Sequence, residues 1–206
     1  MFQSFIVASG ERALLYRDGV FACLLHPGRH CYFDPLRRLR LERVAVAQGP
    51  FEHPLVEQLR RSEPVLVGTE FHDVRVGERE VGLRYLRGAL VEVLPPGARR
   101  LYWRDAGEPR IVRIALPADL RLPYSLTQRL ATPQARTAVA GADAVCAVHV
   151  PEGSVARLRI DGEERGLLLP GRHAYWRFGR EVAAELHAVT AGPAAAFAAA
   201  GGALAG

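Results

Sequence analysis

The chain has 206 residues, of which 49% are hydrophobic and 24% charged, a composition typical of a folded globular protein rather than a disordered one. The formal net charge is +5, yet the sequence contains no Lys, so every positive side chain is an Arg. These Arg residues are scattered, with Arg37, Arg38 and Arg40 the densest group, which argues against a nucleic-acid-binding surface. The lack of Lys also excludes a P-loop nucleotide site.

No segment of the sequence predicts export or membrane insertion. Residues 1–10 lack the basic region and the apolar run of a signal peptide, and no run of about twenty strongly apolar residues predicts a span. The three cysteines, Cys23, Cys31 and Cys146, match no zinc or redox spacing. We therefore expect a cytoplasmic protein whose thiols are reduced and buried.

A repeated segment is the main pattern in the sequence. Its copies occupy residues 10–33, 79–103 and 153–176. In each copy a glycine precedes the proline of a Pro-Gly pair by eight residues (Gly19 and Pro27, Gly88 and Pro96, Gly162 and Pro170). An aromatic pair follows each time (Tyr32-Phe33, Tyr102-Trp103, Tyr175-Trp176). A spacing kept three times predicts three copies of one structural unit.

The local chemistry of each copy predicts antiparallel strands. Asp18-Gly19 and Asp161-Gly162 predict tight hairpin turns, whereas Arg87-Gly88 keeps only the glycine and leaves its turn type open. Strand-like apolar runs flank these turns (13–16, 20–25, 81–85, 90–94, 155–160). Each Pro-Gly pair ends the second strand because proline cannot donate to the ladder. The aromatic pair then begins another strand, and a last apolar run closes the copy (39–46, 111–116, 182–189). Each copy is thus expected to be a small meander.

Short helices are predicted between the copies. One begins at Pro54 and is stopped by Pro64; Ser125 with Gln128 suggests a capping box, and another helix runs from Thr132-Pro133 to Val139. The predicted fold class is α+β, mainly β, with three repeated antiparallel β-meanders joined by short helices. The predicted segments are a first meander at 5–48, a helical linker at 49–70, a second meander at 71–117, a helical linker at 118–143, a third meander at 144–189, and an Ala/Gly-rich tail at 190–206.

Four segments, in this order, carry a resemblance to a known family: GERALLYRDG, HPLVEQL, VGLRYLRGALVEVLPPGARRLYW and LLLPGRHAYW. They resemble the N-terminal region of a bacterial slipin of the stomatin/prohibitin/flotillin (SPFH, band-7) superfamily. The resemblance extends over residues 5–189, and residues 144–189 resemble the start of a band-7 domain. A slipin would continue with the rest of that domain, whereas this chain passes into the tail at 190–206, so we expect a truncated slipin-like chain. The N-terminal membrane hairpin of stomatin-like members is also absent from the sequence.

The resemblance implies a non-catalytic, membrane-associated scaffold or adaptor that is peripheral at the inner face of the cell membrane. Its implied partners are membrane proteins or a membrane-anchored protease, with an oligomer left open and no nucleic acid. An alternative is a soluble β-rich protein–protein interaction module without direct membrane binding, and an inactive remnant is a further alternative. The family offers no catalytic residue to transfer.

The residues themselves point to no chemistry. Cys23, His26, His30 and Cys31 lie close together in the first copy, as metal ligands would, but they flank the Pro27-Gly28 reversal, and the other copies lack the full set. We interpret them as residues that pack or hydrogen-bond around the turn. No Gly-x-Ser-x-Gly motif is present. We therefore assign no catalytic, cofactor-binding or metal site, expect no cofactor, and do not expect an enzyme.

Acidic pairs and aromatic pairs receive similar interpretations. Glu78 with Glu80, and Glu163 with Glu164, fall in hairpin regions where exposed carboxylates are ordinary. The aromatic pairs are expected in the core, because each copy needs a large buried residue there. The alternative is that one member of each pair is exposed and contacts a partner or lipid headgroups.

Overall fold

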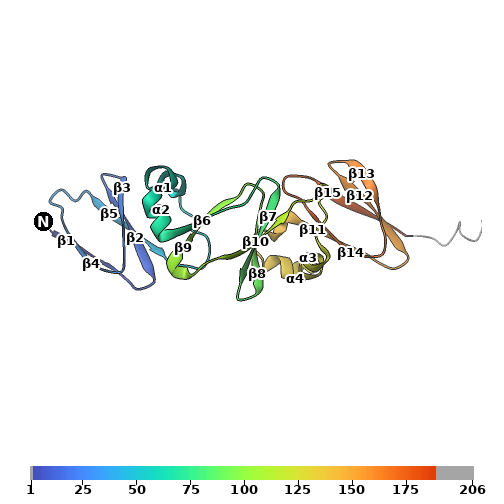
Figure 1. The fold of residues 1–206 in the computed structure, drawn as a ribbon, viewed down its shortest axis with the longest axis horizontal. Helices are drawn as coiled ribbons and strands as arrows, with labels where there is room; N and C mark the ends of the chain where they lie inside the picture. Colours follow the sequence, from blue (N-terminus) through green and yellow to red (C-terminus); the bar gives the residue numbers. More distant parts are fainter. Residues whose placement is uncertain (1, 189–206) are drawn as a thin grey trace, which may run out of the picture. The chain divides into compact units, whose positions relative to one another are not determined.

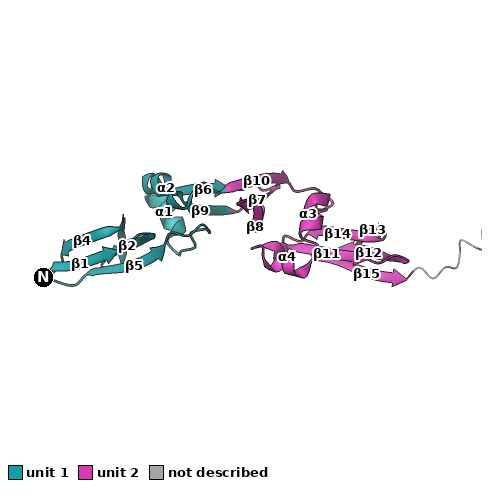
Figure 2. Ribbon diagram, turned by 90° about the horizontal axis from the view of Figure 1, so that it is seen from below, with its two compact units in different colours: residues 1–75, 99–109 teal, residues 76–98, 110–206 magenta. Residues whose placement is uncertain are grey.

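The computed structural model describes residues 2–188, and the predicted tail at 190–206 lies outside the described residues. The described part is mainly β, with several small antiparallel sheets and few helices. The chain divides into two compact units: unit 1 comprises residues 1–75 and 99–109, and unit 2 comprises residues 76–98 and 110–206 (Figure 2). Each unit is described by itself below.

Unit 1 contains two ladders, one sheet and two helices (Figure 1). The first ladder pairs β1 (Phe2–Val7) with β4 (Gly28–Phe33). The sheet has the order β3-β2-β5, with β2 at Glu11–Arg17, β3 at Val20–Leu25 and β5 at Leu39–Ala45. The helices α1 (Val56–Ser62) and α2 (Pro64–Glu70) follow, and the second ladder pairs β6 (Phe71–Arg75) with β9 (Arg99–Trp103).

Unit 2 contains two sheets, one ladder and two helices. The first sheet has the order β10-β7-β8, with β7 at Glu80–Leu86, β8 at Ala89–Leu94 and β10 at Arg110–Ala115. The helices are α3 (Tyr124–Arg129) and α4 (Pro133–Thr137), and the ladder pairs β11 (Val145–Val150) with β14 (Gly171–Trp176). The last sheet has the order β13-β12-β15, with β12 at Ser154–Ile160, β13 at Glu163–Leu168 and β15 at Val182–Ala188. Single 3-10 turns occur at Arg104–Ala106 in unit 1 and at Ala142–Ala144 in unit 2.

The same strand-pairing scheme occurs three times in residues 2–188. In each set of five consecutive strands, the second, third and fifth form a sheet, and the first and fourth form a ladder. This scheme differs from the predicted meander, in which the fourth strand would pair with the third. The Pro-Gly reversal ends the third strand, and the fourth strand pairs instead with a strand (β1, β6 or β11) that the sequence pattern did not mark.

The hairpin turns within these sets are confirmed. Asp18 and Asp161 have φ of 53° and 51°, and the glycines after them have φ of 81° and 80°. Arg87 adopts the same conformation, with φ of 50°, and Gly88 follows with φ of 84°. All three hairpins therefore use two residues with positive φ, as type I′ turns require.

The predicted helices are confirmed, but with different ends. Pro64 ends α1 and also lies in the first turn of α2. Proline is tolerated there because the N–H of a first-turn residue has no acceptor within the helix. The helix predicted to start at Thr132-Pro133 does so, and the Thr132 hydroxyl caps α4 by accepting a 3.2 Å hydrogen bond from the Ala135 N–H. The predicted capping box at Ser125 is wrong: Pro123 is the N-cap of α3, and no side chain caps this helix.

Each sheet that is covered on both faces contributes to two cores. In β2, Leu15 packs with Val7 and Leu25 on one side, whereas Leu14 packs with the helices and with the β6–β9 ladder on the other. The sheet of the first copy is thus covered by the helices and ladder that follow it. Unit 2 repeats part of this arrangement, because buried residues of β7 and β8 share a core with Leu126 of α3 and with the β11–β14 ladder.

Candidate functional site

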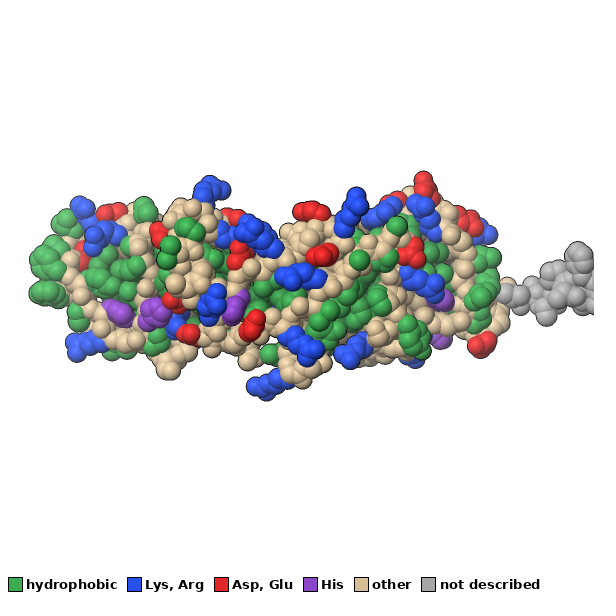
Figure 3. Space-filling view, in the orientation of Figure 1, with side chains coloured by type: hydrophobic (Ala, Val, Ile, Leu, Met, Phe, Trp, Pro, Cys, Tyr) green, Lys and Arg blue, Asp and Glu red, His purple; other side chains and the backbone are tan. Residues whose placement is uncertain are grey.

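The β1–β4 ladder presents an uncovered apolar face. Its cross-strand pairs are Phe2 with Phe33, Ser4 with Cys31, and Ile6 with Arg29. Directly opposed residues point to the same face of a ladder, so these six residues form one surface, here called the β1–β4 face. Phe2, Phe33 and Ile6 are 76%, 64% and 65% exposed, and the two phenylalanine rings are 5.3 Å apart. Figure 3 shows hydrophobic side chains gathered at this end of unit 1.

The corresponding faces of the other two ladders are buried at the end that holds the aromatic residue. On β6–β9, the equivalent pair is Phe71 and Trp103, 1% and 2% exposed, which packs against Leu59 of α1 and Val67 of α2. On β11–β14, the pair is Val145 and Trp176, which share a core with residues of α3. Among the three ladders in residues 2–188, the β1–β4 ladder is therefore the one whose face lacks a helical cover.

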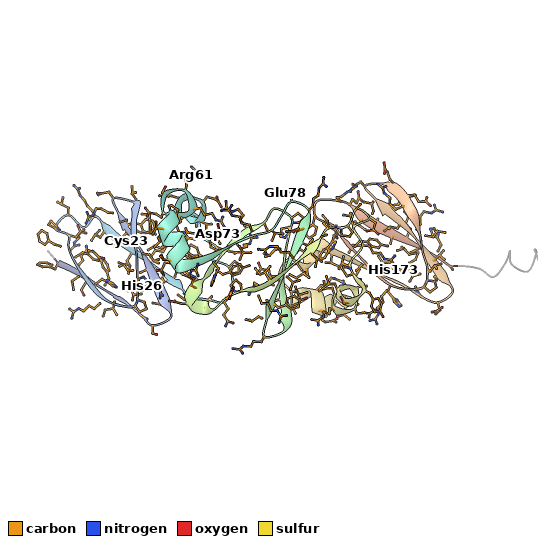
Figure 4. The ribbon with its side chains drawn as sticks, in the orientation of Figure 1. Cys23, His26, Arg61, Asp73, Glu78 and His173 are labelled. Carbon is orange, nitrogen blue, oxygen red and sulfur yellow. The ribbon has the colours of Figure 1, made fainter. Side chains whose placement is uncertain are left out.

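An acidic residue anchors the covered β6–β9 face. The Asp73 carboxylate accepts hydrogen bonds from Arg99 at 2.8 Å and from Arg60 of α1 at 3.2 Å, beside the helical pair (Figure 4). Burial alone would raise the pKa of Asp73, but the hydrogen bond from Arg99 and the charges of Arg60 and Arg99 outweigh it and lower this pKa. The helix and the ladder are thus joined by an ionised carboxylate.

The β1–β4 face has an arginine equivalent to Arg99 but no carboxylate equivalent to Asp73. Ser4 stands where β6 has Asp73, and Arg29 stands where β9 has Arg99. The Arg29 guanidinium donates a 3.2 Å hydrogen bond to the Ser4 hydroxyl. Within the described residues Arg29 makes no ion pair.

The cysteines occupy different environments in the structure. The Cys23 thiol shares a hydrogen bond with the Tyr32 hydroxyl, and burial raises the pKa of Cys23. Cys31 lies on the β1–β4 face, exposed, with its Sγ 3.6 Å from the Ser4 hydroxyl. Cys23, Cys31 and Cys146 are all free thiols. The expectation that all three are buried is wrong: Cys31 is exposed because its side of the ladder is uncovered, and Cys23 and Cys146 are half-buried.

Of the two predicted histidines, the His30 ring bonds around the turn, as the sequence indicated, whereas the His26 ring contacts Glu70 of α2. The His30 Nε2 lies 2.8 Å from the His26 carbonyl oxygen, and the equivalent His173 Nε2 lies 2.8 Å from the Leu169 carbonyl oxygen. The His26 Nε2 lies 3.2 Å from a Glu70 carboxylate oxygen, and Cys23 and His26 lie apart in Figure 4. Across residues 2–188, no three His, Cys, Asp or Glu side chains come together as metal ligands would.

The acidic pairs also separate. The Glu80 carboxylate accepts a 3.2 Å hydrogen bond from the Gly77 N–H. Glu163 pairs with Arg165 at 2.8 Å, and Glu164 pairs with an arginine of β12 at 3.6 Å. Both Glu163 and Glu164 thus form ion pairs with nearby arginines.

The aromatic pairs divide between the two interpretations. Tyr102, Trp103, Tyr175 and Trp176 are all 3% exposed or less, which confirms the core prediction for the second and third copies. Phe33 is 64% exposed, so the core prediction is wrong there. The type of residue could not reveal this difference, because what covers each pair lies elsewhere in the chain.

The β13-β12-β15 sheet carries charge where the other sheets are apolar. Arg157 pairs with Glu164 at 3.6 Å, and Arg159 pairs with Glu185 at 3.1 Å. Counting from the hairpin turn, the same two places hold Leu14 and Tyr16 in the first copy and Leu83 and Tyr85 in the second. The side of this sheet that carries Arg157 and Arg159 is charged, and it therefore does not complement the apolar β1–β4 face.

Every helix in the described part of the chain is too short or too polar to cross a membrane. Comparison of the chain with family models, with curated proteins and with solved structures found no match. The candidate site consequently rests on the geometry of the β1–β4 face. Sequence reasoning missed β1 entirely; the alternation of Phe2, Ser4 and Ile6 with Gln3 and Phe5 was too weakly amphipathic to mark it.

Proposed function

We propose that the chain is a non-catalytic, slipin-like scaffold or adaptor at the cytoplasmic face of the membrane, which binds a protein partner through the β1–β4 face. The observation that carries this proposal is the exposure of Phe2 and Phe33, whose equivalents on the other two ladders are buried beneath helices, with the exposed Ile6 beside them. Exposed apolar residues gathered on one face are typical of interaction sites. We infer further that the three strand sets are copies of one repeat.

The chemistry of the partner follows from the covered ladders. Both are covered by helices with apolar residues, and at β6–β9 an Asp73 carboxylate also joins the helix to the ladder. The partner is therefore a protein that presents an apolar helix with a carboxylate near Arg29. The face of two paired six-residue strands measures about 20 Å by about 10 Å, or roughly 200 Å². This area is small beside the roughly 800 Å² per partner of a stable complex. Reversible binding is expected, which suits an adaptor.

Head-to-tail self-association is disfavoured by the same comparison. The counterpart of a ladder in this chain is an apolar sheet face with helices, and the β13-β12-β15 sheet offers Arg157 and Arg159 instead. Analytical ultracentrifugation at rising protein concentration tests this. A concentration-dependent dimer that Phe33→Glu abolishes would show that the β1–β4 face binds a second copy, which contradicts the proposed partner.

The partner is tested by site-specific photo-cross-linking in the native cell. A photoreactive phenylalanine placed at Phe33 is expected to cross-link a helical segment of another protein, and Arg29→Glu is expected to reduce the yield severalfold. The matched control is the same photoreactive residue at Leu167, an apolar position that is 60% exposed in unit 2. Equal products from both positions, or products unaffected by Arg29→Glu, would count against the proposal.

Flotation with vesicles of phosphatidylcholine and phosphatidylglycerol separates the scaffold from its alternative. A chain that floats in low salt, and floats less with Phe33→Glu, contacts the membrane directly. A chain that stays in the soluble fraction at every salt concentration, yet cross-links a protein partner through Phe33, is the soluble protein–protein interaction module.

A further inference from the structure

Unit 2 contains a cavity of about 430 Å³ beside β12, β13 and the segment 118–121. Its apolar lining includes Leu158, Ile160 and Leu168, all of which are buried. Its polar lining includes Tyr175, the arginines Arg121, Arg165 and Arg180, and Asp119, whose carboxylate accepts a 3.1 Å hydrogen bond from the Arg121 backbone N–H. Apolar walls with a few polar groups, in a space of a few hundred Å³, are typical of small-molecule sites.

The cavity has a clear structural origin. In the third copy Leu158 opposes Gly166 across the hairpin, just before a register shift. The first copy has Leu15 and Cys23 at this place, and the second has an arginine and a glutamate. Gly166 has φ of +137° and no neighbouring atom within 4 Å of the place where a Cβ would lie. The cavity therefore adjoins the position where the other two copies have a side chain.

The same difference leaves a tyrosine hydroxyl without a protein partner. In the first copy the Tyr32 hydroxyl shares a hydrogen bond with the Cys23 thiol. Tyr175, the equivalent of Tyr32, is 3% exposed and lines the cavity, and no group in residues 2–188 hydrogen-bonds to its hydroxyl. Because burial raises the pKa of Tyr175, this hydroxyl stays protonated and can donate to an acceptor in the cavity.

A strained turn places a cation next to this hydroxyl. Leu120 is buried and has φ of +60°, a conformation that non-glycine residues seldom adopt and that often marks functional sites. The turn sets Arg121 in register opposite Tyr175. Glu163 and Asp161 pair with the other two arginines of the cavity, whereas within the described residues the Arg121 guanidinium has no carboxylate partner, its contact being with His173 at 3.4 Å.

We propose that this cavity binds a small monocarboxylate with an apolar body. The carboxylate accepts hydrogen bonds from the Tyr175 hydroxyl and the Arg121 guanidinium, and the apolar body lies against Leu158, Ile160 and Leu168. A neutral molecule of the same shape would leave the Arg121 charge uncompensated. The site is independent of the β1–β4 face, which belongs to unit 1.

Octanoate is a suitable probe, and 1-octanol is its neutral control. Titration of the full chain with octanoate by calorimetry, and by NMR of the tyrosine rings, is expected to show saturable 1:1 binding that shifts the Tyr175 resonances. Octanol is expected to bind at least tenfold more weakly. Octanoate up to about 10 mM that produces no saturable signal and no Tyr175 shift would overturn the proposal, since a monocarboxylate site has a Kd below that range.

Variants separate a specific site from general adsorption. Tyr175→Phe is expected to raise the Kd for octanoate about tenfold, as does loss of one hydrogen bond to a charged group, and Arg121→Gln at least as much. Tyr32→Phe is the matched control, because that hydroxyl already has Cys23 as its partner, and it is expected to leave the Kd unchanged. Equal effects of Tyr175→Phe and Tyr32→Phe would overturn the assignment.

Discussion

The Arg84 and Glu92 side chains form a buried ion pair, with Nε and Oε2 2.6 Å apart. They oppose each other across the β7–β8 hairpin, at the place that Leu15 and Cys23 occupy on the β2–β3 hairpin. In both hairpins the register shifts immediately after this pair. One position of the repeat thus accepts either a salt bridge or an apolar pair.

This equivalence predicts the stability of variants at the pair. Glu92→Ala leaves the Arg84 charge buried without its partner, so the free energy of unfolding is expected to fall by about 3–5 kcal/mol. Arg84→Leu combined with Glu92→Cys copies the Leu15 and Cys23 pair and is expected to recover most of that loss. Urea denaturation of the three proteins measures both effects.

An exposed pair supplies the control. Arg157 and Glu164 lie 3.6 Å apart with side chains 40% and 53% exposed, and Glu164→Ala is expected to cost less than about 1 kcal/mol. A Glu92→Ala loss no greater than that of Glu164→Ala would contradict the burial argument.

Asp73 predicts an acid-sensitive contribution to unit 1. Its pKa is lowered because the hydrogen bond from Arg99 and the charges of Arg60 and Arg99 outweigh the effect of burial. A lowered pKa stabilises the fold above the unfolded-state value of about 3.9, and this stabilisation is lost as the pH falls through the folded-state pKa. The difference in unfolding free energy between wild type and Asp73→Asn, about 1–3 kcal/mol, should be constant above about pH 5 and shrink below about pH 4. A difference that grows on acidification would show the opposite sign of shift.

The cysteines should react with iodoacetamide at different rates. Cys31 is exposed on the β1–β4 face, whereas burial raises the pKa of Cys23 and of Cys146. Because the thiolate is the reactive species, Cys31 should be alkylated first at pH 8, as followed by mass spectrometry of peptides from timed samples. Cys31→Ser should remove the fast phase, and a fast phase that persists in this variant would place the exposed thiol elsewhere.

Two glycines should respond oppositely to alanine. Gly141 has φ of +73°, and a Cβ there would lie 2.4 Å from the Val93 carbonyl oxygen, so Gly141→Ala should lower the melting temperature and cost more than about 2 kcal/mol. Gly68 lies within α2 with no atom within 4 Å of a Cβ, and Gly68→Ala should stabilise by about 0.5–1 kcal/mol. Thermal unfolding followed by circular dichroism would measure both, and equal shifts would contradict the conformational argument.

Local structure was predictable because its causes are adjacent in the sequence. The Asp18-Gly19 and Asp161-Gly162 turns need positive φ at two neighbouring residues, and the strands beside them follow directly. The Thr132 cap of α4 is equally local. The pairing of β1 with β4 is different, since Phe2 and Phe33 meet across two intervening strands, and no short-range signal favours this ladder over a meander.

The candidate site and the cavity depend on comparisons that require the register. Phe33 and Trp103 occupy the same place in their copies, and their exposures differ because helices cover one ladder and not the other. Gly166 looks like an ordinary turn-forming glycine in the sequence. Its link to the cavity becomes visible only when the register places it opposite Leu158. At Phe33 the covering helices are missing, and at Gly166 a side chain is missing. The sequence pattern does not show such absences.

The charged face of the β13-β12-β15 sheet has a consequence for building longer chains. Leu14 and Tyr16 pack against the helices and the ladder that follow their sheet. Arg157 pairs instead with Glu164, and Arg159 pairs with Glu185, at the exposed surface. Grafting a fourth copy would therefore require leucine and tyrosine at these two positions. The side chains at positions 157 and 159 therefore decide whether a further copy can be joined. Extending the chain requires substitutions on this surface and leaves the existing core unchanged.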